Sequence, residues 1–99
     1  MESTDTVLKK LRNLKPELAG KYGVRQVGVF GSYIRNEQKE NSDLDILVDF
    51  EPEVRFGLLK FIEIENYLSD VTGIKVDLVM KEGLKPRIGR KILDEVKYL

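Results

Sequence analysis

Residues 31–45 read GSYIRNEQKENSDLD, and this stretch says more about the fold and the function than the rest of the chain. Its Gly-Ser pair, Gly31 and Ser32, is separated by ten residues from the two carboxylates of Asp43 and Asp45. Apolar residues lead into the Gly-Ser pair and surround the two acids, so these polar groups stand at the ends of predicted buried strands. Polar groups in such positions indicate a functional site.

The composition limits the chemistry of that site. The chain has 99 residues, enough for a single core, and we expect one domain over residues 1–99. Lys and Arg number 17, as do Asp and Glu, so the net charge predicts no strong nonspecific binding to nucleic acid. Cysteine and histidine are absent, which excludes disulfides, thiolate or histidine-activated nucleophiles and the usual zinc sites. Any metal must therefore be held by oxygen, which favours Mg²⁺ or Mn²⁺.

The sequence shows no targeting or membrane segment. Its N-terminal residues lack a basic stretch followed by an apolar one, and no apolar run approaches the roughly 20 residues of a membrane span. We therefore expect a cytoplasmic protein that does not contact a membrane. The sequence leaves open whether the chain forms a homo-oligomer.

Hydrophobic periodicity predicts helices that alternate with strands. Apolar residues at helical spacing predict a helix over the first twenty residues, which Pro16 should kink or divide. The elements predicted after it are a strand over 24–30, a short helix over 32–35, a strand over 43–50, a helix over 55–71, a strand over 75–80 and a closing helix over 88–99. This order is typical of an α/β fold.

Three carboxylates are candidate catalytic and metal-binding residues. Asp43 and Asp45 lie two residues apart on a predicted strand, so they project from the same face and repel each other unless a cation lies between them. Asp77 stands within the third predicted strand, where Asp is disfavoured, and completes a cluster of acids if that strand neighbours the second. The alternatives are a cap or turn role for Asp43 and solvent-facing positions for Asp45 and Asp77. The apolar neighbours of Asp45 argue against them, because an unpaired buried carboxylate is costly.

The Gly-Ser pair is a candidate phosphate-binding turn. Gly31 permits a sharp turn from strand to helix, whose first N–H groups and the Ser32 hydroxyl can hold a phosphate. Taken alone, such a pair is common, and Ser32 could simply cap the short helix. Arg35 lies one helical turn further, where it could meet a phosphate or a carboxylate, or form a weak surface ion pair. Asp49, at the end of its strand, is interpreted as structural.

Together, these features resemble the nucleotidyltransferase superfamily of DNA polymerase β. The motif of that family, a Gly-Ser pair and then Asp-x-Asp, is matched by Gly31, Ser32, Asp43 and Asp45, and its third acid is matched by Asp77. The resemblance covers essentially all of the chain and is strongest to the minimal nucleotidyltransferases of bacteria and archaea. It implies a small mixed β-sheet flanked by helices, an α/β (α+β) arrangement known as the polymerase β-like nucleotidyltransferase fold.

The resemblance also implies how the site works. Two Mg²⁺ ions would lie on the three carboxylates, and Asp77 would help to deprotonate the acceptor. The turn at Ser32 would hold the triphosphate of ATP and the leaving phosphates. Arg35 matches an arginine that many small members have after the Gly-Ser pair, but the glycine that often follows it is Asn36 here. This departure affects the geometry of the loop more than the chemistry.

The minimal proteins of this family are similar to antitoxins paired with HEPN-domain ribonuclease toxins, which they silence by transferring AMP from ATP to a toxin tyrosine. The resemblance therefore implies a protein adenylyltransferase that acts as an antitoxin, with a HEPN toxin supplying the acceptor hydroxyl. Two alternatives stay open, namely an antitoxin that neutralises its toxin by binding alone and nucleotidyl transfer to a small-molecule hydroxyl. Relatives of the second kind carry an additional domain for the acceptor, which nothing in this sequence supplies.

Overall fold

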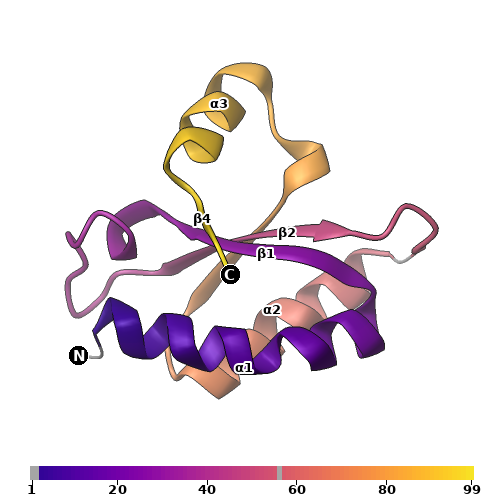
Figure 1. The fold of residues 1–99 in the computed structure, drawn as a ribbon, viewed down its shortest axis with the longest axis horizontal. Helices are drawn as coiled ribbons and strands as arrows, with labels where there is room; N and C mark the ends of the chain where they lie inside the picture. The colour runs from indigo at the N-terminus through magenta and orange to yellow at the C-terminus, as the bar shows by residue number, and fades with distance from the viewer. Residues whose placement is uncertain (1–2, 56) are drawn as a thin grey trace.

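The computed structural model describes residues 3–55 and 57–99 of the chain. Figure 1 shows a small sheet with helices on both of its faces. The elements in chain order are α1 (Thr4–Tyr22), β1 (Val24–Phe30), the one-turn 3₁₀ helix η1 (Gly31–Tyr33), β2 (Leu44–Phe50), α2 (Leu58–Thr72), β3 (Val76–Met80), the 3₁₀ helix η2 (Lys81–Gly83), α3 (Pro86–Glu95) and β4 (Lys97–Tyr98). None of the described helices is long and apolar enough to cross a membrane.

The strands form a four-stranded sheet in the order β3-β2-β1-β4. Strand β1 pairs antiparallel with both β2 and β4, whereas β2 and β3 are parallel. Parallel neighbours need a crossover connection, and α2 supplies it. The predicted mixed sheet flanked by helices is confirmed.

The hydrophobic core lies between the sheet and the helices α1 and α2, which lie side by side on one face (Figure 1). On β2, Leu44, Ile46 and Val48 are fully buried and point toward these helices. Successive side chains of a strand point to opposite faces, so Asp45 projects from the other face of the sheet. Helix α3 stands over that second face in Figure 1. The alternation of β2 thus fixes which side of the sheet carries the acidic residues.

The predicted N-terminal helix differs from the structure at Pro16. Helix α1 continues without interruption through Pro16, so the predicted division does not occur. Buried Leu11 and Leu18 anchor the helix in the core on either side of the proline, which offsets the lost backbone hydrogen bond. The helix predicted over 55–71 is α2. Residue 56 and the first two residues of the chain lie outside the described residues.

The closing helix predicted over 88–99 is wrong in its second half. Helix α3 ends at Glu95, and the next residues form the edge strand β4, whose end is held by the Leu99 N–H donating to the Val27 carbonyl at 3.0 Å. Gly28 on β1 makes room for this strand, because a Cβ there would lie 2.5 Å from Cγ2 of Val96. Unpaired backbone groups along β1 therefore outweigh the helical spacing of the C-terminal apolar residues.

Candidate active site

The Gly-Ser pair forms a tight turn at the end of β1. Gly31 adopts a left-handed conformation with φ of +79°, which is unfavourable for any residue with a side chain. Its carbonyl accepts hydrogen bonds from the N–H groups of Ile34 and Arg35, both at 3.1 Å. The predicted short helix is therefore a single 3₁₀ turn that starts at Gly31. The residue at the N-cap position of this turn is Phe30, so Ser32 does not serve as its cap.

Gly31 also packs directly against the carboxylate of Asp45. A Cβ on Gly31 would overlap the Asp45 Oδ2 atom. This contact places the backbone of the Gly-Ser turn at the carboxylate, as a site that holds a phosphate beside a metal requires. Glycine is needed here for two reasons, the positive φ and the close approach.

Two of the three candidate acids lie on neighbouring strands, and the third lies just before one of these strands. Asp45 of β2 is the register partner of Asp77 of β3, and it also faces Phe30, the last residue of β1. Residues paired across adjacent strands project from the same face, so the carboxylates of Asp45 and Asp77 are neighbours. Asp43 immediately precedes β2, two residues before Asp45. The condition stated for Asp77, that its strand adjoins the second, is fulfilled.

The carboxylates influence one another electrostatically. Burial raises the pKa of Asp45 to about 6, with the negative charges of Asp77 and then Asp43 adding to the effect. Burial makes the ionised form of Asp45 costly, and the neighbouring negative charges add to that cost. The carboxylate is nevertheless mostly ionised at neutral pH, so the fold carries this cost. A cation between the carboxylates would relieve both costs. A perturbed carboxyl in such a cluster is a common property of active sites.

The donor set fits a hard divalent cation. Each of the three residues, Asp43, Asp45 and Asp77, offers carboxylate oxygens, the ligands preferred by Mg²⁺ and Mn²⁺. Within residues 3–55 and 57–99, no group of three or more acidic side chains is already drawn together in the arrangement of a metal site. Asp77 is exposed, whereas Asp45 is partly buried.

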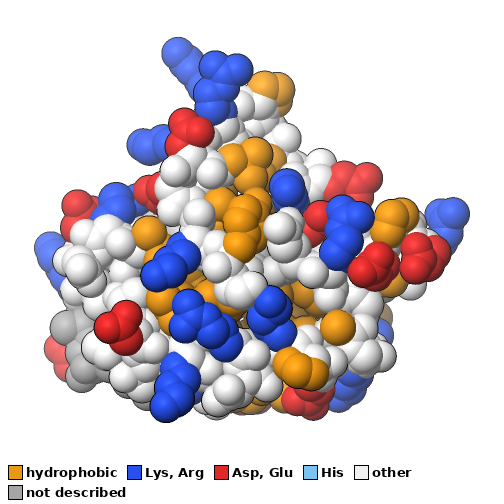
Figure 2. Space-filling model, in the orientation of Figure 1, with side chains coloured by type: hydrophobic (Ala, Val, Ile, Leu, Met, Phe, Trp, Pro, Cys, Tyr) orange, Lys and Arg blue, Asp and Glu red, His pale blue; other side chains and the backbone are white. Residues whose placement is uncertain are grey.

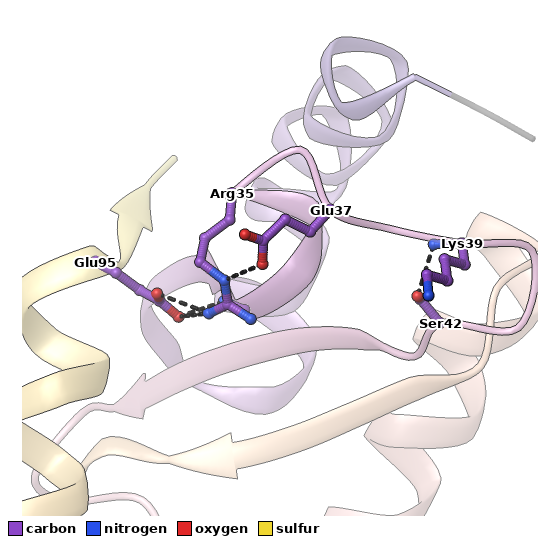
Figure 3. Close-up of polar contacts among 6 residues, drawn as sticks. Arg35, Glu37, Lys39, Ser42 and Glu95 are labelled. Atoms are coloured by element: carbon purple, nitrogen blue, oxygen red, sulfur yellow. Dashed lines mark hydrogen bonds and ion pairs between the residues drawn. The ribbon is translucent and has the colours of Figure 1, made fainter.

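Arg35 contacts acidic side chains other than the three candidates. Its Nε donates to Glu37 at 2.8 Å, and its Nη1 donates to both carboxylate oxygens of Glu95, at 2.9 and 3.1 Å (Figure 3). Arg35 still lies close enough to favour the ionised form of Asp45. It is thus a cation beside the Gly-Ser turn and the acidic cluster, held in place by two other carboxylates.

Glu95 is a site residue that sequence reasoning missed. It ends α3, and its Oε2 atom accepts the backbone N–H of Gly31 at 2.6 Å in addition to its ion pair with Arg35. Nothing in the local sequence indicates this role. The structural cause is the pairing of β4 with β1, which brings Glu95, two residues before β4, to the end of β1. That pairing could not be read from the helical spacing of the C-terminal residues.

Asp49 lies on the same face of β2 as Asp45 but takes no part in the cluster. Its Oδ2 atom accepts a hydrogen bond from Nη2 of Arg25 at 2.5 Å. The interpretation of Asp49 as structural agrees with this ion pair.

The mixed sheet thus carries a strand that ends in a glycine turn, Asp45 and Asp77 on adjacent strands, and Asp43 just before β2. Residues 11–99 match the model of the nucleotidyltransferase domain family, and the chain belongs to this family. It is therefore a member of an enzyme family, as the sequence predicted.

Individual relatives agree. A protein adenylyltransferase, MntA, from Thermococcus cleftensis is 58% identical over 85 residues, which are 86% of this chain and 84% of the relative. A solved structure of a candidate minimal nucleotidyltransferase is 36% identical, with a TM-score of 0.80 over 99% of this chain and 97% of the other. The fold is also shared by the complex of a tri-AMPylated Shewanella oneidensis HEPN toxin with its MNT antitoxin, at 20% identity and a TM-score of 0.60. That match covers 96% of this chain and 66% of the other.

Proposed function

We propose that this chain transfers AMP from ATP to a tyrosine hydroxyl of a HEPN-domain ribonuclease toxin, in a metal-dependent reaction that makes the chain an antitoxin. One observation carries the proposal. The backbone of Gly31 packs against the Asp45 carboxylate, and Asp45 is paired across the sheet with Asp77. The turn that we assign to phosphate binding thus lies against a carboxylate that we assign to metal binding, which supports the proposal.

Each residue has a distinct part in the proposed reaction. The N–H groups of the turn at Gly31 and Ser32, together with the Arg35 guanidinium, bind the triphosphate and orient it for loss of pyrophosphate. Asp77, exposed at the rim, accepts the proton of the acceptor hydroxyl as its oxygen attacks the α-phosphorus. The acceptor oxygen bonds to phosphorus as the bond to the pyrophosphate oxygen breaks.

Asp43, Asp45 and Asp77 are the residues that would hold Mg²⁺ or Mn²⁺. When bound, divalent ions neutralise the charge that develops on the transferring and leaving phosphate oxygens. The strained ionised state of Asp45 supports this assignment, because a cation beside its carboxylate lowers the cost of ionising it.

A protein partner is the acceptor that best suits the site. The acidic cluster opens at the edge of the sheet, where Asp77 is exposed, so an acceptor arriving from outside can reach it. A chain of 99 residues leaves little surface to enclose a small acceptor, whereas a docked protein brings its own hydroxyl. The relative from Thermococcus cleftensis is a protein adenylyltransferase, and the Shewanella oneidensis toxin in the similar complex is AMPylated.

The experiment is intact mass spectrometry of a HEPN-type protein encoded beside this chain, after incubation with the chain, ATP and Mg²⁺. We expect a mass gain of whole AMP units, none with Asp45→Asn, and an unchanged gain with Asp49→Asn. Asp49→Asn is a matched control, because it makes the same chemical change on the same face of β2 at a residue paired with Arg25. No gain with the wild-type chain, although a stable complex forms, would refute the enzymatic proposal.

The second candidate is an antitoxin that acts by binding alone. The one observation in its favour is that the described acids are not drawn together into a ready metal site. Under this function, the double variant Asp43→Asn, Asp45→Asn would still protect a cell that expresses the toxin. Loss of protection, with the complex still formed, would leave only the enzymatic function.

A further inference from the structure

Glu95 occupies the groups that the proposed function assigns to the phosphates of ATP. Its Oε2 atom accepts the Gly31 N–H at 2.6 Å, and the Nη1 atom of Arg35 binds both of its oxygens, at 2.9 and 3.1 Å. In Figure 3, Glu95 reaches from the C-terminal segment toward Arg35, beside the turn. A carboxylate held by a backbone N–H at a glycine turn and by a guanidinium has the surroundings of a bound phosphate oxygen.

The charge of Glu95 is maintained by these same groups. Burial acts to raise the pKa of Glu95, but the Gly31 N–H and the Arg35 guanidinium outweigh it and lower the pKa below its ordinary value. The side chain is therefore an anion at neutral pH. It also adds to the negative potential at Asp45. An incoming triphosphate would meet both the occupied donors and this repulsion.

We propose that Glu95 limits nucleotide affinity, because its carboxylate occupies the phosphate-binding groups at Gly31 and Arg35 and must withdraw when the triphosphate enters. The inference rests on the proposed function. It adds a step that the family motif does not contain, since Glu95 lies fifty residues beyond the Asp-x-Asp pair in the sequence.

The surrounding structure lets Glu95 withdraw at low cost. Of the residues of α3, all of which are described, only Gly89 is buried, and Ile88 and Leu93 are 60% and 42% exposed. The helix is thus weakly anchored compared with α1 and α2, which carry the core. The helix ends at Glu95, and the next residue, Val96, has an extended backbone. Movement of the Glu95 side chain therefore does not have to disturb any helical turn that follows it.

Helix α3 would also gain from the exchange. Its exposed face carries Arg87, Arg90 and Lys91, and Figure 2 shows Lys and Arg side chains at the part of the molecule where α3 stands in Figure 1. Lys91 lies close enough to Glu95 to lower the pKa of that carboxyl. A triphosphate carries more negative charge than one carboxylate, so it would attract Lys91 more strongly.

The test is the affinity for a non-hydrolysable ATP analogue with Mg²⁺, and separately for inorganic tripolyphosphate, measured by isothermal titration. We expect Glu95→Gln to bind both roughly tenfold more tightly than the wild type, because a neutral amide competes less strongly than a carboxylate for the Gly31 N–H and the Arg35 guanidinium. Asp94→Asn, which removes the same charge from the neighbouring exposed residue, controls for long-range electrostatics and should change affinity far less. Glu95→Asp, which keeps the charge on a shorter side chain, should fall between the wild type and Glu95→Gln.

Each outcome decides between two readings of Glu95. If it only holds Gly31 and Arg35 in position, Glu95→Gln and Glu95→Asp will both bind more weakly, and the inference is overturned. Equal binding of the wild type and Glu95→Gln also overturns it, while leaving the proposed function intact. If neither the wild type nor any Glu95 variant binds nucleotide, the inference and the proposed function fall together. With transfer as the readout, Glu95→Gln should lower KM for ATP.

Discussion

Replacement of Asp45 by asparagine should stabilise the fold while removing the activity. The pKa of Asp45 is raised from 3.8 to about 6, and a pKa difference of about 2 corresponds to ~3 kcal/mol, at ~1.4 kcal/mol per unit. Asp45 is only partly buried, so solvent screening reduces this value, and we expect a gain of about 1.5 kcal/mol at pH 7.5. For a domain of this size, that gain raises the melting temperature by roughly 5 to 10 °C.

The sign of the pH dependence follows from the direction of the shift. A carboxyl whose pKa is higher in the folded than in the unfolded state costs stability where it is ionised in both states, above about pH 6. The cost disappears as the pH falls below about 4, where Asp45 is protonated in both states. The advantage of Asp45→Asn should therefore shrink to roughly a third at pH 4.5.

The assay is urea unfolding of the two proteins in EDTA at pH 7.5 and 4.5, because a bound cation would mask the repulsion. Asp49→Asn serves as the control and should bring no gain, since it removes the favourable partner of Arg25. An Asp45→Asn variant no more stable than the wild type at pH 7.5 would show that the ionised Asp45 carboxylate does not destabilise the fold. A gain of equal size at both pH values would show that the charge of Asp45 is not its cause.

Other substitutions test the geometry around the cluster. Gly31→Ala should cost about 2 kcal/mol or more of stability and abolish transfer, because Gly31 has a positive φ and a Cβ there would overlap Asp45. Gly20→Ala in α1 is the control, because a Cβ at Gly20 meets nothing within 4 Å, and it should stabilise the fold by up to ~1 kcal/mol. Urea unfolding measures both changes. Gly28→Ala should push the C-terminal strand from the edge of the sheet and cost about 1 to 3 kcal/mol in the same assay, and an unchanged midpoint would argue against the β1–β4 pairing. Asp77→Asn should slow transfer by about 10²-fold or more, measured by rate of AMP incorporation, while leaving complex formation with the toxin unchanged.

The sequence indicated most of the fold because its decisive signals are local. Strand β1 occupies the predicted residues 24–30, and the other two long strands begin one residue later than predicted, at Leu44 and Val76. Their runs of β-branched and apolar residues are bounded by Gly, Pro and polar residues, which mark strand ends without reference to the rest of the chain. The position of Asp77 beside Asp45 follows from those strands once they are paired.

What could not be predicted depends on contacts between distant residues. The apolar residues near the C-terminus have helical spacing, yet the edge of β1 and the space above Gly28 draw the last residues into β4. The contact of Glu95 with Gly31 depends on that pairing and joins residues 64 positions apart. The overlap of a Gly31 side chain with Asp45 is likewise a matter of tertiary packing. The types and order of these residues can be read from the sequence, but the contacts between them cannot.

Transfer of AMP from ATP to a HEPN-type protein moves the α-phosphate and leaves the γ-phosphate in pyrophosphate. This can be measured with ATP labelled either at the α-phosphate or at the γ-phosphate, incubated with the chain, a HEPN-type partner and Mg²⁺. We expect label on the partner from α-labelled ATP only, and none when Asp45→Asn replaces the wild type. Label from the γ-phosphate, or no label from either while the complex forms, would show that the chain does not transfer AMP to this partner.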